Sequence, residues 1–274
     1  MHLLQIQQLA VWERPGSGVP LLFIHATGFH ARVWDRIIEQ LPGRHCFAMD
    51  LRGHGRSAKN FASWEWRRFG EDTAMVAREL GLRGAVGVGH SIGGYAVALA
   101  AAIEPEAFSR LLLIDPVVQS AERYHDAPFD VSFIRRRRAR WKSAEEMYER
   151  FSQRLPFSAW NQDVLRDYCE FGLLPDGDEF VLACPPEIEA SIYPYTNAPE
   201  TNISAELARI RPAATVMRSA RLARDGSLDL SASYTDPLLA SRIPNARDMQ
   251  IQECSHFIPM ERPDLIVREL ASND

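Results

Sequence analysis

The chain has 274 residues, a length that allows one large domain, or one domain with a sizeable insertion. Hydrophobic residues make up 46% and charged residues 24%, a balance typical of a globular protein, which excludes a disordered chain and a fibrous repeat. The net charge of −5 gives no general affinity for nucleic acid or anionic lipid, and no apolar run approaches the roughly 20 residues of a membrane span.

Short apolar runs alternate with helical patterns along most of the chain. The runs are apolar on both faces, as strands covered on both sides are. Strands that alternate with helices predict an α/β fold with a parallel sheet and right-handed crossovers. The candidate strands are residues 21–24, 46–49, 85–88, 111–114, 214–217 and 249–252.

Three helices are predicted outside a central region. Residues 69–80 (FGEDTAMVAREL) carry apolar side chains at helical spacing and stop at Gly81, a typical C-terminal signal. Residues 93–103 are almost all small or apolar, as expected of a helix that is buried beside a sheet. Residues 263–270 form the last predicted helix of the chain.

Residues 117–205 break this alternation, and we interpret them as a helical insertion between two strands of the sheet. Two helices are predicted there, over residues 143–154, which open on the capping-box pair Ser143 and Glu146, and over residues 163–171. Four consecutive arginines at 135–138 are closely followed by acidic residues. We interpret them as a solvated, salt-bridged face and not as a nucleic-acid site.

The sequence GHSIGG at residues 89–94 fits the pattern G-x-S-x-G. It follows a predicted strand and opens a predicted helix, which is the context that this motif requires. A serine at such a sharp turn has strained backbone geometry, and the flanking glycines relieve the crowding around it. The unpaired N–H groups at the start of the helix can stabilise negative charge beside the serine. We therefore predict that Ser91 is a nucleophile.

Two further loops extend this prediction. The loop at residues 25–29 (HATGF) follows the first predicted strand, and the backbone N–H groups of Thr27 and Ile92 would form an oxyanion hole; the alternative is an ordinary β-turn. His256 follows the last predicted strand, which suits the chain order Ser, Asp, His, and we predict that it is the general base. The histidines inside loop motifs, which we expect to brace the structure, are His25, His54 and His90.

With these motifs the chain resembles the α/β-hydrolase superfamily, over almost its whole length outside the insertion. The matching segments are residues 25–29, 50–57 (DLRGHGRS), 89–94 and 255–257 (SHF). The resemblance implies an α/β-hydrolase fold, with a mostly parallel central sheet flanked by helices. It implies a core domain of residues 1–116 and 206–274, and a helical cap of residues 117–205. It also implies that Ser91 is the nucleophile and His256 the base.

The acid of the triad is less clearly marked. In many members of this superfamily it follows the seventh strand, but here Ser219 replaces the usual glycine and no acid appears before Asp225. Other members, including the haloalkane dehalogenases, carry the acid after the sixth strand, where this chain has Asp115. We favour Asp115 over Asp225, because the acid's work of orienting the imidazole depends on position. The remaining alternatives are Asp229 and Asp236.

The identity of the nucleophile narrows the chemistry. Haloalkane dehalogenases and epoxide hydrolases of this superfamily carry an aspartate at the position of the serine in this turn, which is called the nucleophile elbow. Ser91 at this position instead implies an acyl-enzyme. We expect a carboxylesterase-like hydrolase (EC 3.1.1) for small or medium esters. Alternatives are hydrolysis of a C–C bond or a lactone by the same triad, a haloperoxidase-like side activity, and a non-catalytic ligand-binding protein. Large apolar residues of the cap that would pack it or enclose a pocket are Phe129, Phe133, Trp141, Tyr148, Phe151, Trp160 and Phe171.

We expect no metal ion and no organic cofactor, and a small ester-like molecule as the ligand. Neither nucleic acid nor a membrane is expected as a partner, and a homodimer is an open alternative to a monomer. The N-terminus lacks a signal-peptide pattern. Four widely separated cysteines favour reduced, partly buried thiols in a cytoplasmic protein. They are Cys46, Cys169, Cys184 and Cys254.

Overall fold

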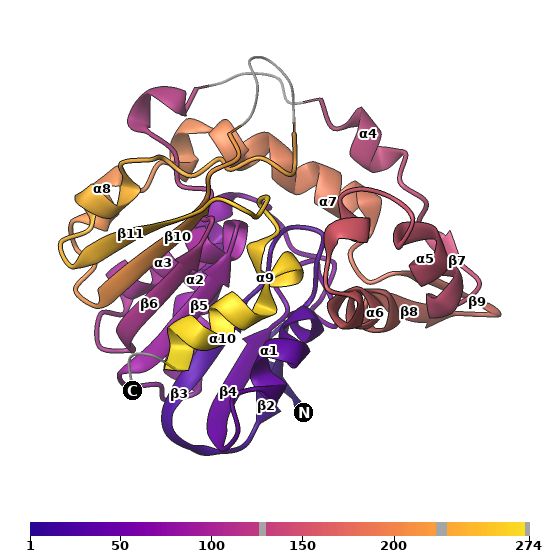
Figure 1. Cartoon of the computed structure of the whole chain (residues 1–274), viewed down its shortest axis with the longest axis horizontal. Helices are drawn as coiled ribbons and strands as arrows, with labels where there is room; N and C mark the ends of the chain where they lie inside the picture. The colour runs from indigo at the N-terminus through magenta and orange to yellow at the C-terminus, as the bar shows by residue number, and fades with distance from the viewer. Residues whose placement is uncertain (126–129, 223–228, 272–274) are drawn as a thin grey trace.

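Eight strands form one central sheet, in the order β1–β2–β4–β3–β5–β6–β10–β11 (Figure 1). The structure, a computed structural model, describes residues 1–125, 130–222 and 229–271. The strands are β1 (His2–Ile6), β2 (Leu9–Arg14), β3 (Ser17–Ile24), β4 (Arg44–Met49), β5 (Ala85–His90), β6 (Phe108–Ile114), β10 (Ala213–Ser219) and β11 (Ala246–Ile251).

The strands from β4 to β11 in this order pair in parallel, and each overlaps one of the predicted apolar runs. The predicted α/β fold with a mostly parallel sheet is therefore confirmed. The antiparallel strands β1 and β2 extend one edge of the sheet and were not predicted. β1 has only exposed and half-buried residues, because it is an edge strand, and so it lacks a buried apolar run.

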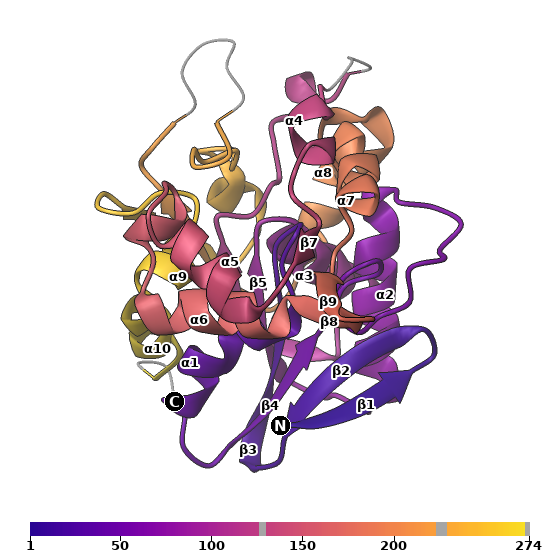
Figure 2. The ribbon, with the colours of Figure 1, turned by 90° about the vertical axis from the view of Figure 1, so that its right-hand side faces the viewer.

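Helices cover both faces of the sheet, as the two views show (Figure 2). Successive residues of β3 point to opposite faces: Leu22 and Ile24 join the core beneath α2 and α3, whereas Leu21 and Phe23 join the core beneath α1 and α10. The three helices predicted outside the insertion are present. The helices on the two faces are α1 (Asp35–Glu39), α2 (Trp66–Glu79), α3 (Ile92–Ile103) and α10 (Pro263–Ala271).

The insertion contains short helices, as predicted, and a small second sheet that was not. Helix α5 begins after Ser143, whose Oγ accepts a hydrogen bond from the Glu146 N–H at 3.1 Å, as the capping pattern predicts. The second sheet, β7–β9–β8, is antiparallel, and its strands are too short to show a pattern. The elements are α4 (Ser132–Arg135), β7 (Arg140–Trp141), α5 (Ala144–Phe151), α6 (Gln162–Phe171), β8 (Leu173–Asp176), β9 (Glu179–Leu182) and α7 (Pro186–Ile192).

The division into core and cap at residues 117 and 205 stays a prediction. Helix α8 (Ser204–Leu207) already packs against α3, and α9 (Ile258–Glu261) follows the loop after β11.

All four cysteines are buried free thiols. None of the helices in the described ranges has the length and apolar content that a bilayer crossing requires.

Candidate active site

Ser91 occupies the turn between β5 and α3 in a strained conformation, with φ +58° and ψ −121°. Such a backbone costs on the order of 1–3 kcal/mol in a residue other than glycine. The glycines around it are required by close packing: a Cβ on Gly89 would lie 2.2 Å from the Gly93 carbonyl oxygen, and one on Gly93 would lie 2.3 Å from the Ile24 oxygen. The elbow predicted from G-x-S-x-G is thus built by strand, turn and helix together.

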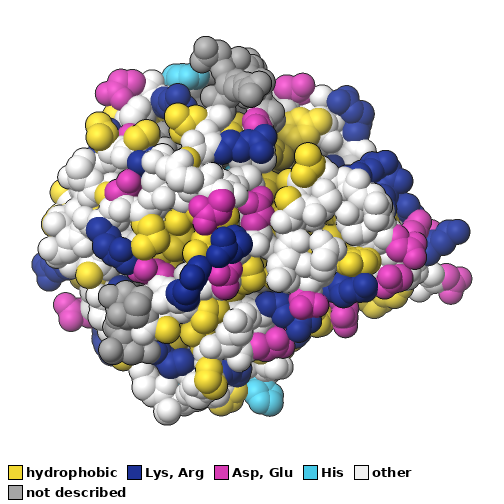
Figure 3. All heavy atoms as spheres, in the orientation of Figure 1, with side chains coloured by type: hydrophobic (Ala, Val, Ile, Leu, Met, Phe, Trp, Pro, Cys, Tyr) yellow, Lys and Arg dark blue, Asp and Glu magenta, His cyan; other side chains and the backbone are white. Residues whose placement is uncertain are grey.

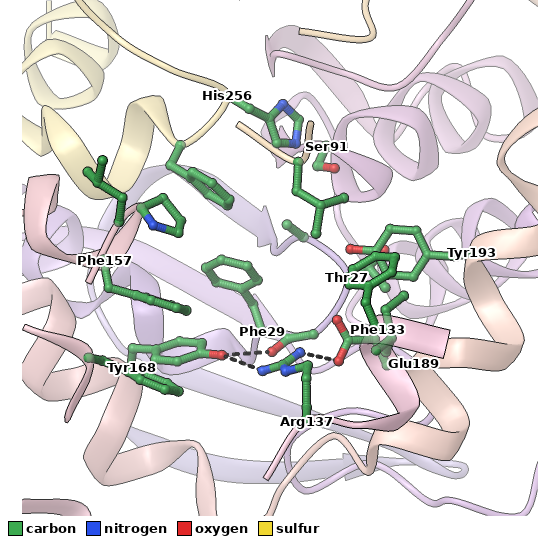
Figure 4. A pocket seen from close by; sticks show the side chains of 18 of the residues that line it. Thr27, Phe29, Ser91, Phe133, Arg137, Phe157, Tyr168, Glu189, Tyr193 and His256 are labelled. Carbon is green, nitrogen blue, oxygen red and sulfur yellow. Dashed lines mark hydrogen bonds and ion pairs between the residues drawn. The ribbon is translucent and has the colours of Figure 1, made fainter. Parts of the chain in front are cut away.

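His256 lies beside Ser91, in the loop between β11 and α9 (Figure 4). Its Nδ1 donates a hydrogen bond to Asp115 Oδ2 at 2.6 Å. Because Nδ1 is held in this way, Nε2 is the ring nitrogen left for the Ser91 hydroxyl. Asp115 comes directly after β6 and is completely buried. The structure thus brings together Ser91, His256 and Asp115.

The second oxygen of Asp115 is held by three donors that the sequence analysis missed. Oδ1 accepts hydrogen bonds from the Ser219 backbone N–H at 3.1 Å, from Ser233 Oγ at 2.6 Å and from Thr235 Oγ1 at 3.2 Å. These donors compensate for burial of the carboxylate and fix its orientation. Ser219 ends β10, the seventh strand of the central sheet in chain order, and is the residue that replaces the usual glycine. Here it supports an acid that follows β6, the sixth strand.

The other candidate acids have different partners. Asp229 is bound to Ser231 and Arg221, and Asp236 forms a 2.8 Å ion pair with Arg242. Asp225 lies outside the described residues. Among the candidates that the structure describes, Asp115 alone contacts His256.

His90 and the backbone of His256 fix the histidine loop. His90 Nε2 donates to the His256 carbonyl oxygen at 2.8 Å, and the His256 N–H donates to the Ser231 oxygen at 2.8 Å. Burial, with the nearby charge of His256, lowers the pKa of His90 well below its ordinary value. His90 is therefore a neutral donor that braces structure, as predicted.

The loop between β3 and α1 forms a β-turn, in which Phe29 N–H donates to the Ala26 oxygen at 3.2 Å. Thr27 lies at the second position of this turn and lines the pocket with Ser91. The Gly28 N–H donates a hydrogen bond to His54 Nε2 at 3.0 Å. His54 is buried and braces this loop, as predicted. Ile92 is the first residue of α3, so its N–H has no acceptor within the helix. The predicted positions of Thr27 and Ile92 suit an oxyanion hole.

A cavity of about 520 Å³ lies over Ser91 and His256. Of the apolar residues named from the sequence, Phe133, Trp141, Phe151 and Trp160 line it. Two others lie elsewhere: Tyr148 packs against Arg166, and Phe171 packs against Arg32. Phe129 is outside the described residues. The aromatic lining residues that the sequence analysis missed are Phe29, Trp66, Phe157, Tyr168, Tyr193, Tyr234 and Phe257.

A polar chain crosses one wall of this cavity (Figure 4). Arg137 pairs with the buried Glu189 and donates a 3.4 Å hydrogen bond to the Tyr168 hydroxyl, which in turn donates to the Gly28 oxygen at 3.4 Å. Burial raises the pKa of Tyr168 to about 12, so the phenol stays a donor. Insertion residues therefore contact the loop that holds Thr27.

The arginine run at 135–138 is only partly the solvated face that we predicted. Arg138 pairs with Glu146 at 2.7 Å, and Arg135 pairs with Glu187 at 3.5 Å. Arg137 instead points into the cavity, where Glu189 compensates for its buried charge, and Arg136 also lines the cavity. The prediction was wrong for Arg137, because the chain after α4 runs along the cavity; Arg136 is exposed, as predicted, but has no ion pair among the described residues.

A parallel sheet with a strained serine after a central strand and a histidine after the last strand is the architecture of a hydrolase fold. A model of the alpha/beta hydrolase family matches residues 21–269, and the chain belongs to this family.

Individual relatives match over part of their length. Esterase Rv0045c of Mycobacterium tuberculosis is 34% identical over 117 residues, which cover 40% of this chain and 37% of that protein. A non-heme chloroperoxidase of Streptomyces lividans is 35% identical over 106 residues, 38% of each protein. The chain thus spans less than two fifths of the length of these curated relatives.

Similarity to solved structures extends over nearly the whole chain. The crystal structure of E-2-(acetamidomethylene)succinate hydrolase matches with a TM-score of 0.78, covering 96% of this chain and 94% of the other. The identity is 20%, so this similarity shows the fold alone.

Proposed function

We propose that the protein is a serine hydrolase that cleaves small or medium carboxylic esters (EC 3.1.1) through an acyl-enzyme. Ser91, His256 and Asp115 are its triad. The observation that carries this proposal is the 2.6 Å contact of His256 Nδ1 with the buried Asp115, beside a serine on a strained elbow. Membership of the alpha/beta hydrolase family supports hydrolase activity.

The first half of the reaction transfers the acyl group to Ser91. Its Oγ attacks the ester carbonyl carbon while His256 Nε2 takes the hydroxyl proton, and the carbonyl electron pair moves to the oxygen. The N–H groups of Thr27 and Ile92 stabilise that oxyanion, and Asp115 stabilises the imidazolium. When the intermediate collapses, the bond to the alcohol oxygen breaks and His256 returns the proton to it.

The second half hydrolyses the acyl-enzyme. His256 takes a proton from water as the water oxygen attacks the acyl carbon. The bond to Ser91 then breaks, and the proton passes from His256 to Oγ. The products are a carboxylic acid and an alcohol, and the balance requires no oxidant or reductant.

Replacing Ser91 with alanine tests the proposal. Hydrolysis of p-nitrophenyl butyrate should fall by about 10⁴-fold or more, since triad members act as a unit, and His256→Ala should cost about as much. Thermal unfolding of the Ser91→Ala variant should be nearly unchanged, because only one hydroxyl is lost. A fluorophosphonate should label the native protein and not the variant. Normal turnover by Ser91→Ala would refute the acyl-enzyme mechanism.

A further inference from the structure

The charged side chains that line the cavity are almost all positive, although the chain as a whole has a net charge of −5. All of these arginines belong to the insertion, on α5 and in the segments that follow α4 and α5. Figure 3 shows basic side chains gathered over α4 and the segment that leads from it to β7. The charged lining residues are Arg136, Arg137, Arg138, Arg150 and Arg154, against Glu189.

Two of the five arginines have a carboxylate partner, and three do not. Arg137 pairs with Glu189, and Arg138 pairs with Glu146. Arg136, Arg150 and Arg154 are exposed, and we call them the rim arginines. Within the described part of the chain, their side chains form no ion pair and no hydrogen bond.

Asp130 is an acidic residue whose charge interacts with that of Arg136. Its carboxylate, however, accepts a hydrogen bond from the Ser132 N–H at 2.8 Å. It forms no ion pair with Arg136, so the rim keeps an excess of positive charge.

The cavity behind the rim has the opposite character. Phe29 stacks on Trp160 with ring centroids 5.5 Å apart, and Phe151 stacks on Phe157 at 4.3 Å, while Ser91 lies at the base. Guanidinium groups bind carboxylates and phosphates through paired N–H donors, whereas aromatic walls favour an apolar chain. A matching ligand has an apolar body and an anionic end.

We infer that this site takes esters or thioesters that bear an anionic group, a carboxylate or a phosphate, which the rim arginines bind while the acyl carbonyl reaches Ser91. This inference rests on the proposed hydrolase function and adds a substrate class to it. Charges at the mouth also attract anions over a distance, so the preference weakens as salt rises. Exposed ion pairs are weak individually, and three together give a preference of about tenfold.

Two matched pairs of substrates distinguish where the anion resides. For a carboxylate on the acyl part, mono-p-nitrophenyl adipate is compared with its methyl ester, which has the same chain without the charge. For phosphate on the leaving group, butyryl-coenzyme A is compared with S-butyryl-N-acetylcysteamine. The anionic member of at least one pair should have a kcat/KM about tenfold higher in 20 mM NaCl, and the ratio should shrink in 500 mM NaCl.

The variant is the triple Arg136→Gln, Arg150→Gln, Arg154→Gln, and the matched control is Arg135→Gln. Arg135 neighbours the rim in sequence and is exposed, but it pairs with Glu187 and does not line the cavity. The triple variant should reduce the anionic-to-neutral ratio to about one, and the control should keep the native ratio. Ratios near one in both native pairs, or an equal loss in the control, would overturn the inference.

A binding measurement separates this inference from the proposed function. Trp141 and Trp160 line the cavity, so tryptophan fluorescence of the Ser91→Ala variant can follow monomethyl adipate and dimethyl adipate. Tighter binding of the monoanion, lost with the rim arginines, supports the site even in a protein that turns over no ester. Equal binding of the two adipates, together with equal kcat/KM for butyryl-coenzyme A and S-butyryl-N-acetylcysteamine, refutes it even where esters are hydrolysed.

Discussion

The Asp115 carboxylate is positioned beside His256 by the backbone conformation of Asp115 as well as by its place at the end of β6. Its φ of +40° lies in the left-handed region, and its N–H donates to the Met217 oxygen on the neighbouring strand. This conformation is rare for a residue other than glycine, and the surrounding hydrogen bonds hold it in place. Among the described residues other than glycine, positive φ occurs at Gln7, Ser91 and Asp115, and two of these three belong to the candidate triad.

Asp115→Asn should cut kcat by up to about 10⁴-fold, because an amide cannot hold the imidazole in the required tautomer. Measuring p-nitrophenyl butyrate hydrolysis checks this, with circular dichroism to confirm folding. Asp225→Asn is the control and should be mild. The reverse ranking would move the acid to the loop after β10.

Buried histidines make stability depend on pH. Burial lowers the pKa of His25 to about 3 and that of His30 to about 4, against 6.5 in the unfolded chain. Below pH 6.5 the unfolded state therefore binds protons that the folded state does not, so stability falls as pH drops from about 6.5 toward 4. Burial raises the pKa of Asp167 to about 6, which acts in the opposite direction.

Replacing His30 with glutamine isolates one of these sites. Unfolding of the native protein by urea at several pH values should show an uptake near pH 5 that exceeds that of His30→Gln by about one proton. Equal slopes of unfolding free energy against pH in the two proteins would show that His30 is protonated in the fold.

At the scale of elements, a hydrogen bond from α6 supports the loop after β3. The Tyr168 hydroxyl donates to the Gly28 oxygen, next to the proposed oxyanion donor Thr27. We expect Tyr168→Phe to lower kcat about three- to tenfold with a smaller change in KM, since one hydrogen bond is worth about 1 kcal/mol and the loop's work falls in the transition state.

Tyr148→Phe is the matched control for Tyr168→Phe. Its hydroxyl, on α5, donates to Gln162 at the surface and lies away from the cavity. In steady-state kinetics, Tyr168→Phe should have a lower kcat than the native protein, whereas Tyr148→Phe should keep the native kcat. A loss confined to KM in Tyr168→Phe would mean that the hydroxyl serves ligand binding and not the loop.

Elements with a strong local signal could be predicted, and those held by distant contacts could not. The parallel strands are short buried runs, and α2 ends two residues before Gly81, so both are visible in the sequence. The edge strand β1 has no buried residue, and β7, β8 and β9 each have only one, too few to show an alternating pattern. Ser233 and Thr235 are 118 and 120 residues from Asp115, and no spacing rule links them.

At the scale of the whole molecule, the insertion and the sheet enclose the cavity between them. Ser91, Thr27 and His256 come from loops at the carboxyl ends of strands, where ligands bind in open α/β sheets. The facing wall consists of insertion residues such as Phe151 and Trp160. A substrate must fit this space, so we propose that residues 117–205 act as a cap that limits its size.

For p-nitrophenyl esters of increasing acyl length, kcat/KM should rise and then fall steeply beyond about eight carbons. Each added methylene offers roughly 0.8 kcal/mol of burial only while room remains. Rates measured from acetate to laurate check this. Activity that increases on long-chain triglyceride emulsions would contradict an enclosed cavity.

The contact between Asp115 and His256 joins residues 141 positions apart, and its supports come from the end of β10, the loop after it and His90 at the end of β5. Contacts of such large sequence separation form late, since the intervening chain must first be ordered. Under the proposed mechanism, a refolding chain would regain its secondary structure before its enzymatic activity. Turnover would then report the final placement of the loops that carry Asp115 and His256, a step that changes far-ultraviolet circular dichroism very little.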